Sequence, residues 1–244
     1  MGKGKIKLFQ RGQQKPKKAD PQPNEEVVIG CTVYNEEDRL PGFLHDHRFV
    51  PHIIIIDQSS TDKTGDIARC TKNVSYHRVA RFERLGEASF NVLQQLCPHN
   101  AWMLLLGVDE RVSEDHYRMM RARAHDGRVK YGFMAYWLHR KNEVDGKDVN
   151  HLFRTDYDLE GKDWQMRLTY GYRVHYQNVP HMHPEPMAAW AYMQEDVYLT
   201  HCKTLAEELD SIRKRSGSVN GTAHRDVAYL EGLKKVFGEG AVKL

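Results

Sequence analysis

The feature that most constrains the fold of this sequence is a series of four short apolar runs, each followed by a polar segment. The second run, residues 52–56, is almost continuously β-branched, as expected of a strand buried on both faces of a parallel sheet. The other runs cover Val27–Val33, residues 74–79 and residues 101–106, and amphipathic stretches separate them. This alternation predicts an α/β fold in which helices flank a mainly parallel sheet.

Several segments between and after these runs carry helix signals. Asn35 is placed to cap a helix over residues 36–45, and Ser113 precedes two acids that suit the first turn of another helix. Thr204 and Glu207 have the spacing of a capping box for a helix that runs to residue 215. Further helices are expected over Thr64–Cys70, residues 86–97 and a last amphipathic segment marked by Val227, Leu230, Leu233 and Phe237.

The pattern weakens after the fourth apolar run. Residues 131–138 predict a strand that returns aromatic side chains to the sheet. Between residues 139 and 200 we expect only short strands and loops, with a turn at Asp145-Gly146.

The chain divides into three parts by composition. Residues 1–24 read as a disordered basic leader, because seven of the 36 Lys and Arg residues lie in the first 20 positions beside one of the 33 Asp and Glu residues. This leader is a candidate contact for an anionic surface such as membrane lipid, RNA or DNA. Residues 25–216 form the predicted domain, and residues 217–244 a C-terminal amphipathic helix.

Apolar runs and cysteines indicate the compartment. The longest apolar runs fall far below the ~20 residues of a membrane span, and no signal-peptide pattern follows the basic N-terminus. We expect a cytoplasmic protein, with peripheral membrane association as a further possibility. The four cysteines lie far apart, as expected of reduced thiols in a chain of 244 residues.

Polar segments follow all four predicted strands. Ligands of open parallel sheets bind beyond the carboxyl ends of the strands, so these segments are expected to converge on one crevice. There the Tyr34 ring can stack on a base, and the Asp57 carboxylate can accept hydrogen bonds from a base or a ribose. This combination is typical of a nucleotide-binding site.

Charged residues after the third and fourth strands extend this interpretation. Asp109 ends an apolar strand and is placed to hold a divalent cation, Mn²⁺ or Mg²⁺, which would neutralise a departing diphosphate. Arg81 and Arg84 can donate charge-assisted hydrogen bonds to the same phosphates. The predicted ligand is therefore a nucleoside diphosphate with its metal ion.

At these residues the chain resembles family 2 inverting GT-A glycosyltransferases, particularly bacterial enzymes of the lipopolysaccharide-core type. VIGCTVYNEE at residues 28–37 resembles the family's opening strand and YNEE turn. IIIDQSSTDKT at residues 54–64 resembles its VVDSGSTDGT segment, and WMLLLGVDERV at residues 102–112 its WVLFLDADERV segment. Gly86 with Asn91 resembles its glycine-to-asparagine helix start. The match spans residues 27–215 in order.

The resemblance implies a GT-A fold with a mixed, mainly parallel sheet, and it implies a metal-assisted glycosyltransferase. The donor would be a nucleoside-diphosphate sugar, and the acceptor a hydroxyl on a glycan, a lipid-linked glycan or a modified nucleic acid. The nucleotide would be held by Thr32, Tyr34, Glu36 and Asp57, and the metal by Asp109. One departure is Gly107, which stands where the family has the first acid of its DxD motif.

The later part of the chain resembles the family more loosely. His201 matches the family's histidine before a terminal helix, so it is a candidate metal ligand; a structural histidine within the core is the other interpretation. Inverting transfer needs a carboxylate base on the acceptor side. Glu185 is the chosen candidate, because HPE at residues 183–185 resembles the family's HE and prolines flank it. The other carboxylates considered are Asp163, Glu195 and Asp196.

Alternatives stay open for several of these residues. His181 and His183 could form a zinc site with His201 or Cys202, whereas His45 and His47 read as surface residues. A non-catalytic nucleotide-sugar-binding protein is the second functional hypothesis, motivated by Gly107. A sugar-phosphate nucleotidyltransferase is the third, although the glycine-rich loop it needs after the first strand is replaced by YNEE.

Overall fold

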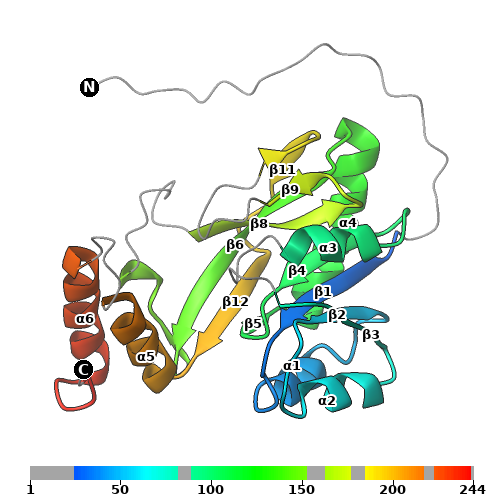
Figure 1. Cartoon of the computed structure of the whole chain (residues 1–244). Coiled ribbons are helices and arrows are strands. Elements are labelled where there is room, and N and C mark those ends of the chain that lie inside the picture. The colour runs from blue at the N-terminus through cyan, green and yellow to red at the C-terminus, as the bar shows by residue number, and fades with distance from the viewer. Residues whose placement is uncertain (1–24, 82–88, 153–162, 177–184, 217–222, 243–244) are drawn as a thin grey trace, which may run out of the picture.

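The structure is a computed structural model that describes residues 25–81, 89–152, 163–176, 185–216 and 223–242. Its strands build one ten-stranded sheet and a separate two-stranded sheet, and helices lie on both sides of the large sheet (Figure 1). The predicted α/β class with a mixed, mainly parallel sheet is therefore confirmed. Among the helices within these ranges, none combines the length and the apolar character needed to cross a membrane.

The first half of the large sheet is parallel. It contains β1 (Val27–Val33), β2 (Ile53–Asp57), β3 (Val74–Arg78) and β4 (Trp102–Leu106), in the spatial order β3-β2-β1-β4. Every residue of β2 and β4 is buried, which the apolar runs predicted. The order reverses between β1 and β4, so the carboxyl ends of these two strands form a topological switch point.

The second half of the sheet is mixed. It contains β5 (Glu110–Arg111), β6 (Ala135–Val144), β7 (Lys147–Asp148), β8 (Asp163–Tyr170), β11 (Trp190–Tyr192) and β12 (Tyr198–Lys203). β8 runs antiparallel to both β4 and β6 and so joins the two halves. β11 and β12 pair in parallel with successive parts of β6. The short strands β9 (Val174–His175) and β10 (Glu185–Pro186) form the two-stranded sheet.

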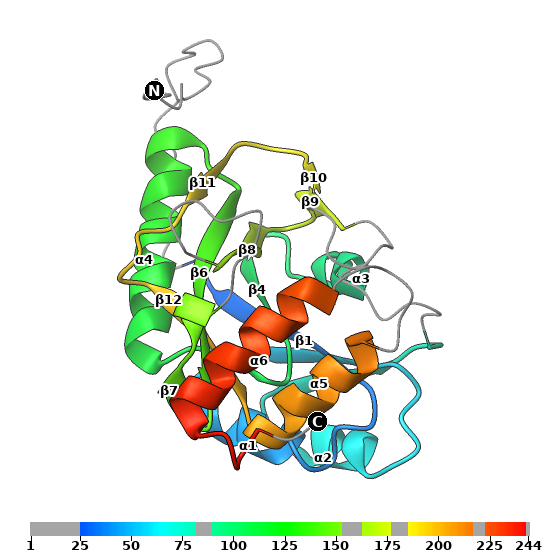
Figure 2. The same ribbon diagram turned by 90° about the vertical axis from the view of Figure 1, so that its left-hand side faces the viewer.

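Two apolar layers sandwich the sheet. On one face, buried side chains of α1 (Leu40–Asp46), α2 (Thr64–Cys70) and α4 (Glu114–Tyr131) pack on the sheet. On the other face, α3 (Ser89–Leu96) packs on β1, β2 and β4 through residues such as Phe90 and Leu93. Figure 2 shows α4 and α3 on opposite sides of the sheet. Burial of these apolar side chains is the main favourable term for the fold.

A third apolar cluster lies at the far end of β6. There α5 (Leu205–Ser216) and α6 (Ala223–Phe237) pack side by side, together with the short 3-10 helix η1 (Asn150–Leu152). The predicted capping box starts α5: the backbone N–H of Thr204 donates to Glu207 Oε2 at 2.7 Å, and that of Glu207 donates to Thr204 Oγ1 at 3.2 Å. The turn predicted at Asp145-Gly146 joins β6 to β7, with φ values of 46° and 73°.

Three sequence expectations are wrong. The first helix begins at Leu40, not at residue 36, and Asn35 has a left-handed backbone (φ 53°) and does not cap it. Tyr131 ends α4, so the strand expected from residue 131 begins only at Ala135. Between residues 139 and 200 the structure has longer strands than expected, because polar residues of β6 and β8 pair with one another across the strands.

His47 is the fourth difference, because it is fully buried although it was expected at the surface. Its Nδ1 lies 2.8 Å from the carbonyl oxygen of Phe43, and its Nε2 accepts the backbone N–H of Val112 at 3.2 Å. The carbonyl can only accept and the backbone N–H can only donate, so the ring is neutral with its proton on Nδ1. Burial lowers the pKa of His47 from 6.5 to about 4.

This burial predicts a pH dependence of stability. Between pH 6.5 and 4 the unfolded chain binds a proton at His47 that the folded chain does not, so stability falls as the pH is lowered through this window. At pH 4 the free energy of unfolding should be about 3 kcal/mol lower than at neutral pH because of this residue. Urea unfolding at pH 7 and pH 4.5 checks this, with His47→Gln as the comparison. The prediction is wrong if wild type and His47→Gln lose the same stability between the two pH values.

Candidate functional site

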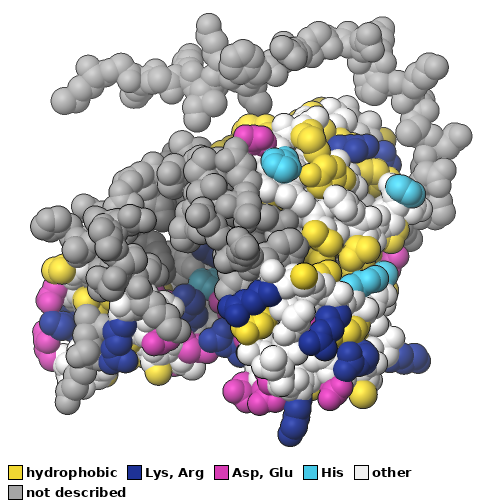
Figure 3. Space-filling view, viewed as in Figure 1, with side chains coloured by type: hydrophobic (Ala, Val, Ile, Leu, Met, Phe, Trp, Pro, Cys, Tyr) yellow, Lys and Arg dark blue, Asp and Glu magenta, His cyan; other side chains and the backbone are white. Residues whose placement is uncertain are grey.

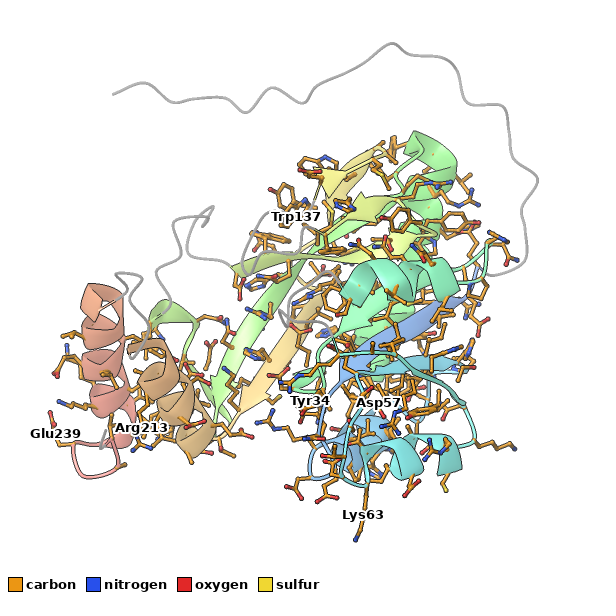
Figure 4. The ribbon with its side chains drawn as sticks, in the orientation of Figure 1. Tyr34, Asp57, Lys63, Trp137, Arg213 and Glu239 are labelled. Carbon is orange, nitrogen blue, oxygen red and sulfur yellow. The ribbon has the colours of Figure 1, made fainter. Side chains whose placement is uncertain are left out.

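The carboxyl ends of the parallel strands bring the predicted nucleotide-binding segments together. Register pairs Val33 with Asp57 across β1 and β2, and Cys31 with Leu106 across β1 and β4. The loops after β1, β2 and β4 therefore leave the sheet at the same edge, where Figure 4 shows Tyr34 and Asp57. This is the topological switch point, at which open α/β sheets bind ligands.

The loops after β1 and β2 are locked to each other by side chains. The backbone N–H of Asn35 donates to Ser60 Oγ at 2.9 Å, and the backbone N–H of Thr61 donates to Asn35 Oδ1 at 2.9 Å. The backbone N–H of Glu36 donates to Thr64 Oγ1 at 2.7 Å. Through these bonds the YNEE and QSSTD segments satisfy backbone groups of each other.

Asp57 is buried at the centre of this edge, with 1% of its surface exposed. Its Oδ1 accepts the backbone N–H of Ser60 at 2.7 Å, and its Oδ2 accepts the hydroxyl of Tyr76 at 2.6 Å. Burial and this hydrogen bond raise the pKa of Tyr76. Asp57 therefore holds the loop in place, a structural role in addition to the nucleotide contact that the sequence predicted.

Tyr34 and Arg81 contact each other above this loop. The guanidinium carbon of Arg81 lies 3.9 Å from the centre of the Tyr34 ring, and Nη1 donates to the Tyr34 hydroxyl at 3.0 Å. An aromatic ring and an arginine placed in this way suit a base and an anionic phosphate. Thr32 is half-buried and accepts a hydrogen bond from Gln58 Nε2 at 2.9 Å. The predicted partner Arg84 lies outside the described residues.

Arg78 is a cation at this edge that sequence analysis missed. It ends β3 directly beside Asp57 in the register, is exposed, and donates to the carbonyl oxygen of Ser60 at 3.3 Å. Its position at the carboxyl end of the third strand is the signal that could have identified it. Figure 3 shows that Lys and Arg side chains gather on this lower part of the visible face.

Asp109 and His201 meet at the end of β4. The His201 Nε2 lies 3.1 Å from Asp109 Oδ2, and both side chains are partly exposed. Although burial raises the pKa of Asp109, the hydrogen bond and charge of His201 lower it well below its usual range. The carboxylate is therefore ionised at neutral pH.

The orientation of His201 is set by Asn142. Asn150 Oδ1 accepts the backbone N–H of Asn142 at 3.0 Å and is therefore an acceptor. The Asn142 side-chain atom that lies 3.0 Å from the same oxygen must then be the donor Nδ2. Asn142 Oδ1 therefore faces His201 Nδ1 at 2.9 Å, and that nitrogen carries a proton. The other ring nitrogen faces the Asp109 carboxylate.

Glu110, the residue after Asp109, is a buried carboxylate that the sequence analysis did not single out. With 2% of its side chain exposed, it accepts from Arg140 at 3.0 Å, from Arg167 at 3.3 Å and from the backbone N–H of Gly107 at 2.8 Å. Burial raises the pKa of Glu110, but the charges of Arg167 and Arg140 lower it by more, so the pKa lies below its usual value. Arg140 also donates to Asp163 at 2.8 Å.

Gly107 leaves room for this arrangement. A Cβ atom at this position would lie 2.6 Å from Asp109 Oδ1, closer than such atoms approach one another. The Asp109 carboxylate therefore occupies the space that a side chain at position 107 would need. The first acid of a DxD motif is not accommodated without a shift of Asp109.

Glu36 lies near this group. Burial raises its pKa, Arg39 at 3.6 Å opposes the rise, and the charge of Asp109 adds to it. The electrostatic coupling indicates that the YNEE loop and Asp109 line one region. Of the predicted site residues, Thr32, Tyr34, Glu36, Asp57, Arg81, Asp109 and His201 come from segments at this edge of the sheet.

The predicted acceptor-side carboxylates have different surroundings. Asp163 is held by Arg140, and Asp196 makes two hydrogen bonds with Arg123 of α4, at 2.5 and 2.7 Å. Glu185 on β10 and Glu195 are both exposed. His181 and His183, proposed as zinc ligands, lie outside the described residues, and within those residues no three His, Cys, Asp or Glu side chains cluster as a metal site.

No protein-family model matches the chain, and comparison with curated proteins gives no match. Among solved structures, residues 1–349 of TarS from S. aureus are similar, with a TM-score of 0.48 and 14% identity over 88% of this chain and 72% of that chain. A 4-diphosphocytidyl-2C-methyl-D-erythritol synthase from Anaerococcus prevotii has a TM-score of 0.37 and 10% identity over 61% of this chain and 70% of that chain. Both are likenesses of fold.

The contacts of Asp57 predict that it contributes to stability. Asp57→Ala leaves the Ser60 N–H and the Tyr76 hydroxyl without their acceptor, so it should lower the free energy of unfolding by about 2–3 kcal/mol, and Tyr76→Phe by about 1 kcal/mol. Asp66→Ala, which removes an exposed acid on α2, is the control and should change it by less than about 0.5 kcal/mol. Urea denaturation measures all three. Equal effects of Asp57→Ala and Asp66→Ala would contradict the structural role.

Proposed function

We propose that the protein transfers a sugar from a nucleoside-diphosphate sugar to an acceptor hydroxyl with inversion, assisted by Mn²⁺ or Mg²⁺. The observation that carries the proposal is the pairing of the Asp109 carboxylate with an oriented His201 ring at the switch point of the sheet. A carboxylate and an imidazole nitrogen that face each other are a donor set for a divalent cation. The adjoining Tyr34 and Arg81 suit the nucleotide and its phosphates.

The residues present fit such a metal ion. Asp109 is ionised and partly exposed, and Asn142 orients His201 from behind, as outer partners of metal-binding histidines do. An imidazole ligand favours Mn²⁺ over Mg²⁺. When bound, the metal supplies positive charge that stabilises the diphosphate as it leaves.

The chain's own residues would then have separate tasks. Tyr34 stacks on the base, and Arg81 moves from the Tyr34 ring to the phosphates, where Arg78 adds a second cation. A carboxylate on the acceptor side takes the proton of the attacking hydroxyl. Glu185 and Glu195 are exposed, and Glu185 stays the preferred candidate for this base.

A non-catalytic nucleotide-sugar-binding protein is the second candidate, favoured by Gly107 in place of an acid. Turnover separates the two: a panel of nucleoside-diphosphate sugars is screened for thermal stabilisation with and without Mn²⁺, and the stabilising sugars are then assayed for release of the nucleoside diphosphate. Stabilisation without any release under either metal would favour the binding protein. No stabilisation by any member would contradict both.

The metal assignment predicts that Mn²⁺ binding needs Asp109 and His201. In the presence of a nucleoside diphosphate, Asp109→Asn and His201→Ala should each weaken Mn²⁺ binding about tenfold or more, because each removes one ligand. Electron paramagnetic resonance of free Mn²⁺ measures this. Asp126→Asn, an exposed acid on α4, is the control and should bind as wild type does. If Asp109→Asn binds Mn²⁺ with wild-type affinity, the assignment of the metal to this site is wrong.

The base assignment predicts that Glu185→Gln lowers kcat by on the order of 10² or more, because glutamine keeps the shape of the side chain but cannot take a proton. Binding of the nucleoside-diphosphate sugar, measured by calorimetry, should be retained. Glu195→Gln is the matched comparison and should keep most of the activity. If Glu195→Gln is inactive while Glu185→Gln turns over normally, the base is Glu195.

A further inference from the structure

An aromatic cluster lies on the sheet face beside α3. Three of the four tryptophans of the chain gather there with one tyrosine: Trp137 on β6, Trp164 on β8, and Trp190 and Tyr192 on β11. Register pairs Tyr192 with Trp137 and Trp190 with Ala135, so these side chains share one face. Trp137 packs against the core that α3 covers, and Figure 4 shows it well above Tyr34 and Asp57. We call these four residues the aromatic platform.

The rings of the aromatic platform form a continuous series. The ring centres of Trp164 and Tyr192 are 5.0 Å apart, those of Tyr192 and Trp190 are 5.6 Å apart, and those of Trp137 and Trp190 are 6.2 Å apart. Each pair meets edge to face, with interplanar angles of 72°, 83° and 68°. Trp190 and Tyr192 are 41% and 44% exposed. Large aromatic side chains seldom gather at an exposed surface unless they bind something.

One end of the platform lies toward the edge of the sheet that carries the proposed active site. Trp164 directly follows Asp163, but the two side chains lie on opposite faces of β8, where Trp164 contacts His139 and Asp163 contacts Arg140. β8 runs antiparallel to β4, so its Trp164 end lies toward the carboxyl end of β4, where Asp109 follows. A ligand that lies along the platform therefore ends near the edge at which the transfer is proposed.

The charges around the platform indicate the class of ligand. Residues 185–198, which carry Trp190 and Tyr192, include Glu185, Glu195 and Asp196 and no Lys or Arg. The arginines that neighbouring elements bring to this region, Arg123 and Arg140, are paired with Asp196 and Asp163. A nucleic-acid strand or an anionic membrane would need cations beside the stacking rings. A neutral carbohydrate does not, and the C–H face of a sugar ring carries the slight positive charge that the electron-rich face of an indole attracts.

We propose that the aromatic platform is the acceptor subsite and binds a neutral oligosaccharide, whose sugar rings pack against the differently oriented faces and edges of Trp164, Tyr192 and Trp190. This inference rests on the proposed glycosyl transfer and names its acceptor as a glycan of several sugar units. The exposed Gln194 and the Tyr192 hydroxyl lie at the same segment and can donate to sugar hydroxyls.

Maltohexaose, cellohexaose and chitohexaose serve as probes, with an oligothymidylate strand for comparison. Binding to the whole chain is followed by calorimetry and by acrylamide quenching of tryptophan fluorescence; Trp102 is fully buried and does not respond. At least one hexasaccharide should bind more tightly than its monosaccharide and should protect the tryptophans from acrylamide.

Single substitutions test whether the hexasaccharide binds at the aromatic platform. Trp190→Ala and Tyr192→Ala should each weaken hexasaccharide binding about tenfold, and Trp190→Phe should retain most of it because the ring remains. Tyr131→Ala removes an aromatic residue on α4 that is 69% exposed, and it is the control that should bind as wild type does. Circular dichroism confirms that each variant is folded.

The outcomes separate the two proposals. Failure of every hexasaccharide to bind wild type, or equal binding by Trp190→Ala, overturns the acceptor subsite. If wild type also fails to bind any nucleoside-diphosphate sugar, the proposed function fails by a separate measurement. Binding of the oligothymidylate through Trp190, or a dimer that Trp190→Ala converts to monomer, would assign the platform to a nucleic acid or to a second copy of the chain instead.

Discussion

The buried carboxylate of Glu110 joins the two halves of the molecule. It accepts hydrogen bonds from Arg140 on β6, from Arg167 on β8 and from the backbone at the end of β4. A buried charge is costly unless it is paired and hydrogen-bonded, so once it is buried its partners are fixed in place. Because Glu110 follows Asp109 directly, the position of the candidate metal ligand depends on this contact between the parallel and the mixed part of the sheet.

The two sides of the candidate site differ in how they are held. The loops after β1 and β2 are fixed by reciprocal hydrogen bonds between backbone and side chains, and Asp57 is buried beneath them. Arg81, by contrast, is exposed and contacts Tyr34. Fixed loops lose little conformational entropy when a ligand binds, whereas an exposed arginine is free to change position. For the nucleotide site proposed here, the loops would be preformed and Arg81 would move from the Tyr34 ring to the phosphates.

The parallel half of the fold could be predicted from the sequence mainly because β1, β2 and β4 are apolar runs buried on both faces. The four strands of this half were placed to within one residue, and the capping box of α5 was recognised from two residues. The continuation of β6 beyond Leu138 and the length of β8 were missed because Arg140, Asn142 and Asp163 are polar residues of strand interiors, and their partners are far apart in the sequence. Asn35 and His47 were misassigned for the same reason: the groups that satisfy them belong to other segments.

Gly107 changes what should be looked for in related sequences. Position 107 has no side chain, Asp109 occupies the space beside it, and Glu110 binds its backbone N–H. A search that requires an acid two residues before the aspartate that we propose as a metal ligand would pass over proteins built in this way. A pattern of glycine, any residue, aspartate and glutamate, with one arginine on each of two paired strands later in the chain (β6 and β8 here), describes the same arrangement through its buried ion pairs.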